Sequence, residues 1–455
     1  MFFLYSLLLT FGLIALMPRF IYDALRHGKY IPGLWERLGK LPLINAQGRP
    51  VIWLHCVSVG ETQAARPLAR AILERFPAHA LVVSTTTVTG QRVAREVFGD
   101  SAAAVFYFPF DWAWTTRRAL SSVKPSAVLI METELWPNFL RECHSGLIPV
   151  VLVNGRLSEK SFRRYRLIRP FIRRAVDCLA LALMQTADDE RRLRALGLAD
   201  ERVRTVGNVK FDAGAALDQQ ALTEELRERF RLDETRPLIV AASTHAPEER
   251  IVLEAFRRLR AASGTASARL LLAPRHPERF AEAAALLEAS GLVWSRRSEE
   301  PAERDALCDA ILLDSIGELR AVYSLADVVF VGGSIARTGG HNILEPAAAG
   351  TAILTGHHTF NFAAIMRAFT EAGAVLQLPA LTEEVAPAAL AQALAELLRD
   401  EERRRALSAR AFEVLERNRG ATERTIKLLT PILANPTVLD VPGQSHSAQQ
   451  DALKA

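Results

Sequence analysis

The sequence predicts an α/β protein built from two doubly wound domains. Its 455 residues exceed what a single hydrophobic core comfortably serves. Short apolar runs alternate along the chain with amphipathic stretches, as they do in βαβ units. The alternation lapses near Asp212, in the polar stretch DAGAALDQQALTEEL, and then begins again. Two successive sets of parallel-sheet units imply two domains that face each other across a cleft.

The first of these domains is expected over residues 23–212 and the second over residues 213–430. Strand candidates in the first are the apolar runs 50–58, 80–85, 103–108, 126–131, 149–154, 179–184 and 202–206. Strand candidates in the second are 237–242, 269–273, 292–295, 310–313, 328–331, 351–354 and 374–376, with helices following over 383–400 and 402–429. The polar tail, residues 431–455, is expected to be disordered.

The N-terminus carries an apolar run, MFFLYSLLLTFGLIALM, which is followed by Arg19, Arg26 and Lys29. No basic region precedes the run and no clear small-residue cleavage site follows it, so a cleaved signal peptide is not indicated. Positive charge after the run indicates that the rest of the chain stays on the cytoplasmic side. We therefore expect a single N-terminal membrane anchor over residues 1–22, with a buried amphipathic helix as the alternative.

A basic segment, GRLSEKSFRRYRLIRPFIRRA, interleaves aromatic residues at roughly helical spacing. Its cations are Arg156, Lys160, Arg163, Arg164, Arg166, Arg169, Arg173 and Arg174. A solvated helix face is the ordinary explanation of such a run, and nucleic acid would use similar residues. The apolar N-terminus favours anionic membrane lipids over nucleic acid as the partner. The net charge of +5 agrees with an anionic partner, and the four separated cysteines suggest neither disulfides nor zinc.

Polar residues follow the strand candidates of the first domain, where ligands of doubly wound sheets bind. In HCVSVGE, Glu61 opens a helix and is either a favourable first-turn carboxylate or a general base. In METELWPN, Glu132 and Glu134 follow the fourth strand, and alternation predicts that they share one side of an extended chain. In NVKFD, Lys210 is a candidate for stabilising anionic charge or a solvated linker lysine.

The strand ends of the second domain favour a nucleotide site. Arg275, in PRHPERF, is able to hold a phosphate through a bidentate fork. DSIGEL lies between a strand and a helix, where backbone amides point at ligands. Asn342 and Glu345 form a plausible capping box, while Gly339 and Gly340 permit close approach of the backbone to a ligand. Neither a P-loop nor a dinucleotide-binding fingerprint is present.

Seven segments together carry a resemblance to a known family. They are HCVSVGE, METELWPN, NGRLSEKSFRRY, GNVKFD, PRHPERF, DSIGEL and GGHNILEPAAAG, in this order. From the N-terminal run to about Leu429, the chain resembles the 3-deoxy-D-manno-octulosonic acid (Kdo) transferases of lipopolysaccharide synthesis. The resemblance implies a GT-B-type glycosyltransferase with an N-terminal acceptor domain and a C-terminal donor domain. It also implies inverting transfer of Kdo from CMP-Kdo to the lipid A precursor lipid IVA, at the bacterial inner membrane.

The resemblance further assigns roles to individual residues. Glu61 of SVGE would be the general base, and Glu132 and Lys210 would support catalysis. It implies CMP contacts at Pro274, Arg275, Ile316, Gly317, Glu318, Asn342, Ile343, Leu344 and Glu345. The sequence has Cys56 and Ser315 where the family more often has alanine and threonine, and Ile343 where proline is frequent. None of these departures removes a chemical group that the reaction needs.

No cofactor is expected, and transfer is expected to be independent of metal. CMP has a single phosphate, so a metal that bridges a pyrophosphate is less necessary, and no DxD motif stands at a strand end. One alternative is a GT-B transferase that moves a sugar from a UDP-sugar to another membrane lipid. Another is a non-catalytic, membrane-bound module for nucleotide-sugars or lipids, which would tolerate the loss of Glu61.

Overall fold

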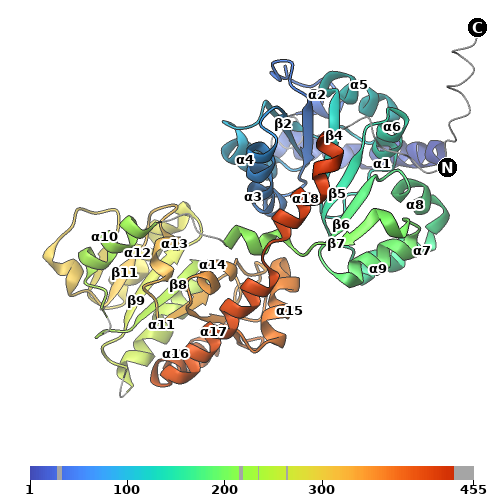
Figure 1. Cartoon of the computed structure of the whole chain (residues 1–455). Coiled ribbons are helices and arrows are strands. Elements are labelled where there is room, and N and C mark those ends of the chain that lie inside the picture. Colours follow the sequence, from blue (N-terminus) through green and yellow to red (C-terminus); the bar gives the residue numbers. More distant parts are fainter. Residues whose placement is uncertain (28–32, 215–218, 234, 263–264, 435–455) are drawn as a thin grey trace, which may run out of the picture. The chain divides into compact units, whose positions relative to one another are not determined.

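The computed structural model describes the chain except for residues 28–32, 215–218, 234, 263–264 and 435–455. It divides into two compact units, the first formed by Met1–Ala213 and Arg419–Ala455, the second by Gly214–Asn418. Each unit contains one 7-stranded parallel sheet flanked by helices (Figure 1). The predicted α/β class with two parallel sheets is therefore confirmed.

The sheet of the first unit has the strand order β3-β2-β1-β4-β5-β6-β7. Its strands are β1 (Val51–His55), β2 (Ala80–Thr85), β3 (Ala104–Tyr107), β4 (Pro125–Met131), β5 (Val150–Gly155), β6 (Leu181–Met184) and β7 (Val203–Thr205). Consecutive strands proceed outward from β1 to β3, and the chain then returns to place β4 on the other side of β1. The direction of winding thus reverses between β1 and β4, which is where ligands of such sheets bind.

Helices cover both faces of this sheet. They include α3 (Val59–Arg75), α4 (Val88–Phe98), α5 (Ala113–Val123), α6 (Pro137–Ser145), α7 (Glu159–Leu167), α8 (Arg169–Val176), α9 (Ala187–Leu196) and α18 (Ala421–Ala434), besides the short α2 (Leu34–Arg37). Alternate residues of β1 enter different cores: Val51 and Trp53 join one cluster, Ile52 and Leu54 the other. Burial on both faces explains why the strands appear in the sequence as continuous apolar runs.

The second unit also has a seven-stranded parallel sheet, with the strand order β10-β11-β9-β8-β12-β13-β14, in which the fourth strand lies between the second and the third. Its strands are β8 (Leu238–Thr244), β9 (Arg269–Pro274), β10 (Trp294–Arg296), β11 (Ala310–Leu312), β12 (Val328–Val331), β13 (Ala352–Thr355) and β14 (Leu376–Gln377). Its helices are α10 (Gln220–Phe230), α11 (Glu248–Ala261), α12 (Phe280–Ala289), α13 (Leu319–Tyr323), α14 (Leu344–Ala348), α15 (Ala363–Glu371), α16 (Ala386–Arg399) and α17 (Glu401–Asn418). Here the winding reverses between β8 and β12.

The last described helix, α18, belongs to the first unit, whereas the sequence placed residues up to 430 in the second domain. Leu429 and Ile432 of α18 join the core that also holds Ile52 and Leu54. Asp212 fixes the start of the helix, since its carboxylate accepts hydrogen bonds from the N–H groups of Gly420 (2.7 Å) and Thr422 (2.6 Å). The helix continues to Ala434, and the remainder of the predicted disordered tail lies outside the described residues.

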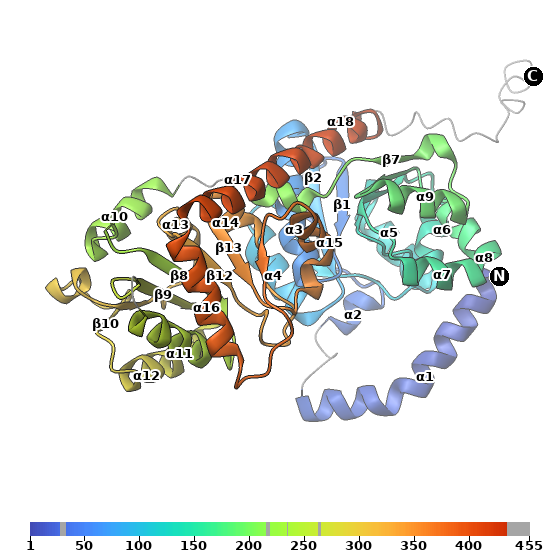
Figure 2. The same ribbon diagram turned by 90° about the horizontal axis from the view of Figure 1, so that it is seen from below.

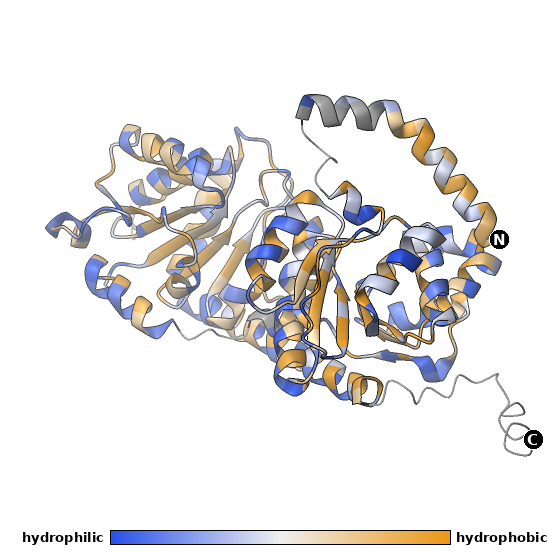
Figure 3. Cartoon of the chain, turned by 90° about the horizontal axis from the view of Figure 1, so that it is seen from above, coloured by the Kyte–Doolittle hydropathy of each residue, from blue (hydrophilic) through white to orange (hydrophobic). Residues whose placement is uncertain are grey.

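The N-terminal helix α1 (Phe2–His27) packs against the first unit through one face. Ser6 accepts a hydrogen bond from Asn138 (2.9 Å), Thr10 accepts one from Trp112 (3.0 Å), and the rings of Phe2 and Tyr5 each lie 5.6 Å from that of Phe171. Figure 2 shows the N-terminal end of α1 beside α8. Figure 3 shows that the N-terminal part of α1 is predominantly hydrophobic. Its opposite face exposes Phe3, Leu4, Leu7, Leu8, Phe11, Ile14, Leu16 and Met17.

The structure does not support the expected membrane-spanning anchor over residues 1–22. Among the residues that the structure describes, no helix is both long and apolar enough to cross a membrane. The apolar run ends at Met17, short of the roughly 20 residues that a span requires. Ser6 and Thr10, in the middle of this run, make polar contacts with the first unit instead.

Candidate active site

Glu61 and Glu132 lie at the point where the winding of the first sheet reverses. Glu61 stands in the first turn of α3, which follows β1, and Glu132 directly follows β4. These strands are paired and parallel, so their carboxyl ends meet at one edge of the sheet. The topology therefore brings together two carboxylates that are separated by 71 positions in the sequence.

The carboxylate of Glu61 takes part in the contacts that begin α3. Its carboxylate accepts hydrogen bonds from the N–H of Val57 (2.8 Å) and the hydroxyl of Ser58 (3.0 Å), and Ser58 caps α3. The residue is 8% exposed. Burial and then the charge of Glu132 raise the pKa of Glu61 to about 7, against the lowering effect of the bonds from Val57 and Ser58. A helix-start carboxylate is thereby tuned to the range that suits a general base.

Glu132 forms an ion pair with Lys210, with 2.8 Å between Oε1 and Nζ. The side chain of Glu132 is 21% exposed and that of Lys210 is 22% exposed. Glu132 has a φ of 55°, so the chain turns here and is not extended. The alternation argument for Glu132 and Glu134 was therefore wrong, although both carboxylates still act on the pKa of Glu61. Burial and the charge of Glu132 also raise the pKa of Glu134.

Asn154 is a site residue that the sequence analysis did not identify. It lies near the end of β5, is fully buried and has a φ of 54°. Its side-chain oxygen accepts a hydrogen bond from the N–H of Val209 (3.1 Å), next to Lys210. Asn154 thus holds the segment that carries the lysine. The asparagine-glycine pair at the end of an apolar run was the available signal, because asparagine tolerates the left-handed region.

In the second unit, two histidines meet at the reversal point between β8 and β12. The Nε2 atoms of His245 and His341 are 2.7 Å apart, and their rings are parallel within 3°. One imidazole must donate and the other accept, so the accepting ring is neutral in this arrangement. Burial and the neighbouring His245, Arg275 and His276 lower the pKa of His341 to about 3. Among the described residues, no group of three or more His, Cys, Asp and Glu is placed to hold a metal ion.

Pro274 and Arg275 stand at the end of β9, beside this histidine pair. Pro274 is buried, while the side chain of Arg275 is exposed and its N–H donates to the carbonyl of Thr244 (3.0 Å). Burial, followed by the charge of Glu345, raises the pKa of the neighbouring Tyr323, and Arg275 opposes this effect. Arg275 and Glu345, which the sequence separates by 70 positions, thus act on the same buried hydroxyl.

Ile316, Gly317 and Glu318 form the connection before α13. Ile316 is 79% exposed, and Gly317 has a φ of 91°, which favours glycine. The carboxylate of Glu318 is held by both ends of the Arg297 guanidinium (2.9 and 3.1 Å). Although burial opposes it, the hydrogen bonds from Arg297 and Ser315 hold the pKa of Glu318 below its usual value. Its carboxylate is thus engaged within the unit, and the backbone of the connection remains the group suited to a ligand.

The segment from Asn342 to Glu345 does not form the expected capping box. The helix α14 begins at Leu344 after Ile343, which provides no side-chain cap. Asn342 accepts a hydrogen bond from the N–H of Leu344 (3.1 Å), while Glu345 pairs with Arg320 (2.9 Å). The amide of Asn342 also donates a longer hydrogen bond to Glu345 (3.4 Å), at the same Oε1 atom that Arg320 binds.

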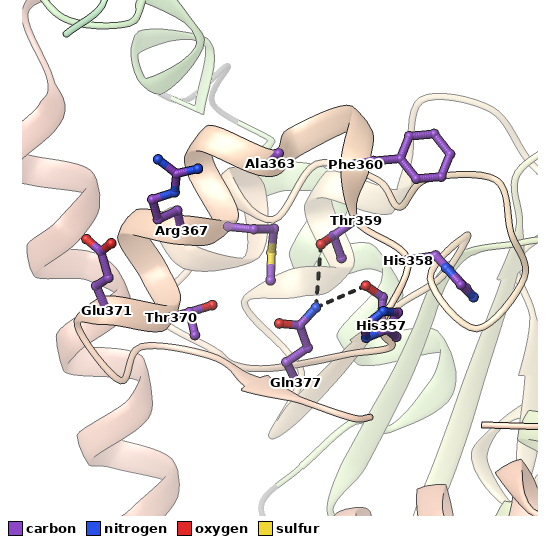
Figure 4. A pocket seen from close by; sticks show the side chains of 10 residues that line it. His357, His358, Thr359, Phe360, Ala363, Arg367, Thr370, Glu371 and Gln377 are labelled. Atoms are coloured by element: carbon purple, nitrogen blue, oxygen red, sulfur yellow. Dashed lines mark hydrogen bonds between the residues drawn. The ribbon is translucent and has the colours of Figure 1, made fainter. Parts of the chain in front are cut away.

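A pocket of about 460 Å³ lies beyond the carboxyl ends of β13 and β14. Figure 4 shows Gln377 beneath it, bonded to the carbonyl of His357 (3.2 Å) and the hydroxyl of Thr359 (3.5 Å), with Arg367 at the rim. None of the site residues predicted from the sequence lines this pocket. The segment HHTF (residues 357–360) forms part of its lining, and the sequence analysis did not single it out.

Comparison with known proteins decides the family. Residues 32–213 match the family described as 3-deoxy-D-manno-octulosonic-acid transferase (kdotransferase). A transferase of this name from Haemophilus influenzae is 37% identical over 407 residues, covering 89% of this chain and 92% of the relative. The chain belongs to the Kdo transferase family. The Kdo transferase of Bordetella pertussis is likewise 37% identical, covering 92% of this chain and 97% of the relative.

Membership of the Kdo transferases makes this chain a glycosyltransferase and confirms the resemblance seen in the sequence. Solved structures agree on the fold. A UDP-GlcNAc 2-epimerase from Neisseria meningitidis has a TM-score of 0.55 at 13% identity, covering 84% of this chain and all of that one. A glycosyltransferase from Rickettsia africae has a TM-score of 0.51 at 11% identity, covering 85% of this chain and all of that one. The Kdo transferase thus has the α/β fold with two parallel sheets of the GT-B class.

Proposed function

We propose that this Kdo transferase moves Kdo from CMP-Kdo to the lipid A precursor lipid IVA, with inversion at the anomeric carbon. The observation that carries the proposal is the carboxyl group of Glu61, buried at the reversal point of the first sheet with a pKa of about 7. Such a group is ionised in part at neutral pH and is still basic enough to take a proton from an attacking hydroxyl. The identity of the transferred sugar is inferred from the relatives that are named Kdo transferases.

In the proposed reaction, Glu61 removes the proton from a hydroxyl group of the acceptor. The hydroxyl oxygen attacks the anomeric carbon of Kdo from the face opposite CMP, and the bond from that carbon to the phosphate oxygen breaks. CMP departs with the bonding electron pair, and the proton remains on Glu61 until water accepts it. Glu132 and Lys210 support this step: the charge of Glu132 keeps Glu61 basic, and Lys210 stabilises negative charge that develops nearby.

The donor is assigned to the second unit. We place the CMP phosphate near the exposed guanidinium of Arg275, a group that matches two phosphate oxygens at once. The nucleoside would lie along the backbone of Ile316–Glu318 and of Asn342–Glu345. The conformation of Gly317, at φ 91°, lets that backbone approach a ligand without a side chain intervening.

The acceptor is a lipid, and the first unit has a surface suited to the inner membrane. The exposed apolar side chains of α1 adjoin α8, since Phe2 and Tyr5 contact Phe171. Arg163, Arg164, Arg166, Arg169 and Arg173 of α7 and α8 are exposed. We propose that α1 lies in the membrane surface and that these arginines bind anionic headgroups.

Competition between nucleotides tests the donor. We expect CMP to inhibit Kdo transfer competitively with CMP-Kdo, and UDP at the same concentration to leave the rate unchanged. A UDP-sugar enzyme would show the reverse order, and that result would replace the donor proposed here. Arg275→Ala should raise the inhibition constant of CMP about tenfold or more, because a charge-assisted hydrogen bond is lost.

A further inference from the structure

The side chain of Glu248, at the start of α11, is fully buried although it carries a carboxylate. Its Oε2 accepts hydrogen bonds from the N–H groups of His245 (3.0 Å) and Gly333 (2.6 Å). Its Oε1 accepts hydrogen bonds from the N–H groups of Ser334 (2.9 Å), Ile335 (2.8 Å) and Ala336 (3.1 Å). Successive backbone N–H groups of this kind form a cradle for an anion. In this chain the cradle is filled by the protein's own carboxylate.

Glu248 therefore joins two loops that the sequence keeps far apart. One loop follows β8 and the other follows β12, the adjacent strands between which the winding of the second sheet reverses. The two loops pack closely here, because a Cβ atom on Gly332 would lie 2.8 Å from the carbonyl oxygen of Ser243 and 2.9 Å from Oε2 of Glu248. No side chain larger than hydrogen fits there without displacing the backbone.

Hydrogen bonds connect these two loops to the loops after β9 and β13. Thr244, on the β8 side, accepts the N–H of Arg275 (3.0 Å). Ser334, within the cradle, accepts the N–H of Gly356 through its hydroxyl and the N–H of His358 through its carbonyl, each at 2.8 Å. Four strand ends, including the one that carries Arg275, are thus linked around one buried carboxylate.

The positions of His245 and His341 depend on the same contacts between the loops after β8 and β12. The backbone of His245 is bonded to Glu248, and the ring of His341 lies against Gly333, where an added Cβ would come within 2.9 Å of Cδ2. The 2.7 Å separation of the two Nε2 atoms therefore requires that both loops keep their positions. Glu248 contacts both of these anchoring points.

We propose that Glu248 is a positioning residue for the donor, which holds the loops after β8 and β12 so that Arg275, His245 and His341 are presented to a nucleotide-sugar together. This inference rests on the proposed assignment of the donor to the second unit. Glu248 itself touches no donor, because its two oxygens are occupied by backbone groups and it has no exposed surface.

The charge of Glu248 is essential to this role. Burial raises the pKa of Glu248, whereas the N–H groups of Gly333, His245, Ile335 and Ala336 oppose that rise. Both oxygens accept N–H groups, so a proton on either one would face a donor. In Glu248→Gln the volume is conserved, but the new NH₂ group must point at two or three backbone N–H groups. This variant disrupts the cradle without creating a cavity.

Glu249 provides a matched control. It is the next residue, is equally buried, and binds the guanidinium of Arg279 (2.9 Å) in place of the cradle. Glu249→Gln therefore removes a buried charge from the same helical turn while leaving the loop after β12 in contact with Glu248. Glu248→Asp is the second test variant, since it keeps the charge and shortens the reach by one methylene group.

The experiment uses the full chain and two measurements. Amide hydrogen exchange should become faster at residues 333–336 in Glu248→Gln and stay unchanged there in Glu249→Gln. Steady-state kinetics should show the KM for CMP-Kdo raised about tenfold or more in Glu248→Gln. The KM for lipid IVA should be unchanged, and Glu248→Asp should recover part of the loss. A purely structural role would alter both KM values or neither.

Either measurement can overturn the proposal. Unchanged exchange at residues 333–336 in Glu248→Gln would refute the cradle, whatever the donor is. Faster exchange with a donor KM within twofold of the wild type would refute the positioning role. If the wild-type chain transferred no Kdo, the proposed function would fail instead. Calorimetric binding of CMP to the two variants would then decide the role of Glu248, with equal affinities refuting it.

Discussion

The carboxyl group of Glu61 is subject to opposing influences whose balance determines its chemistry. Burial and the charge of Glu132 disfavour ionisation, and the hydrogen bonds from Val57 and Ser58 favour it. The result is a pKa of about 7, above the ordinary value of 4.5. The same contacts that begin α3 thus orient this carboxyl group, and its raised pKa comes from surroundings that make the ionised form costly.

This balance predicts the pH dependence of transfer. The kcat/KM should rise with pH and level off above a pKa of about 7, because the base must be ionised. Glu134→Gln should shift that limb to lower pH, since the charge of Glu134 contributes to raising the pKa of Glu61. The measurement is a pH–rate profile with saturating acceptor and limiting CMP-Kdo. A profile flat between pH 5 and 9 would refute the assignment of the base.

Stability should show the opposite trend at the same residue. The folded pKa lies above the unfolded value, so the contribution of Glu61 to stability is full below about pH 4.5 and is lost as the pH rises through about 7. Glu61→Gln should therefore be at least as stable as the wild type at pH 8. Urea unfolding of both chains at pH 8 and pH 5 measures this difference in stability. If the variant is stable but inactive, its loss of activity is not caused by unfolding. A marked loss of stability at pH 8 would contradict the pKa.

Glu132 and Glu134 should differ because only one of them is seen paired with Lys210 among the described contacts. Glu132→Gln and Lys210→Met should each lower kcat about tenfold or more, and the double variant should lose less than the sum of the two. Glu134→Gln is the control and should keep most of the activity near pH 8. A larger loss from Glu134→Gln than from Glu132→Gln would reverse the assignment.

At the scale of elements, the strands were predictable because each is buried on both faces. The run 80–85 coincides with β2 (Ala80–Thr85), and the run 126–131 differs from β4 (Pro125–Met131) by one residue. The positions of Glu61, Glu132 and Lys210 near strand ends followed from the same pattern. The turn at Glu132 and the cradle around Glu248 were not predictable, since they depend on residues brought together by the sheet and not by the sequence.

Two differences between the predicted and the observed elements have identifiable causes. The expected helix over 402–429 divides at Gly420, which has a φ of 83°, and α18 then packs on the first unit. The glycine was visible in the sequence, but the contact with Asp212 was not. In the basic segment, Phe162, Tyr165 and Phe171 are partly buried against the core, and the exposed side chains there include Leu167 and Ile168 besides the arginines.

The return of α18 to the first unit gives a prediction about Asp212. Its carboxylate binds the N–H groups of Gly420 and Thr422 at the helix start, so Asp212→Ala should cost about 1–2 kcal/mol of unfolding free energy. Glu423→Ala is the control: Glu423 is an exposed acid in the same first turn and should cost less than about 0.5 kcal/mol. Urea unfolding measures both, and equal effects would show that the cap contributes no more than the helix dipole.

At the scale of the whole molecule, two units that each contain a seven-stranded parallel sheet carry complementary chemistry. The reversal point of the first holds carboxylates and a lysine, which suit proton removal. The reversal point of the second holds a pair of imidazoles beside an exposed arginine, which suit an anionic nucleotide-sugar. Site chemistry of this kind, together with family membership, supports a glycosyltransferase more strongly than the fold alone would.

The surface of the first unit predicts selective membrane binding. The full chain should bind vesicles that contain phosphatidylglycerol more tightly than vesicles of phosphatidylcholine alone. Reversal of two exposed cations on α7 and α8, Arg166→Glu with Arg169→Glu, should weaken binding about tenfold or more. The control reverses two exposed arginines elsewhere, Arg70 and Arg405. Flotation measures the bound fraction, and equal losses in both double variants would contradict a specific surface.

The most direct test of the central claim is transfer of Kdo from CMP-Kdo, generated in situ, to lipid IVA. The full wild-type chain and Glu61→Gln would be compared, with product mass followed. We predict product from the wild type, with the mass counting the sugars added, and almost none from Glu61→Gln at equal stability. Product at the same rate from both chains would remove Glu61 as the base, and no product from the wild type would contradict the proposed reaction itself.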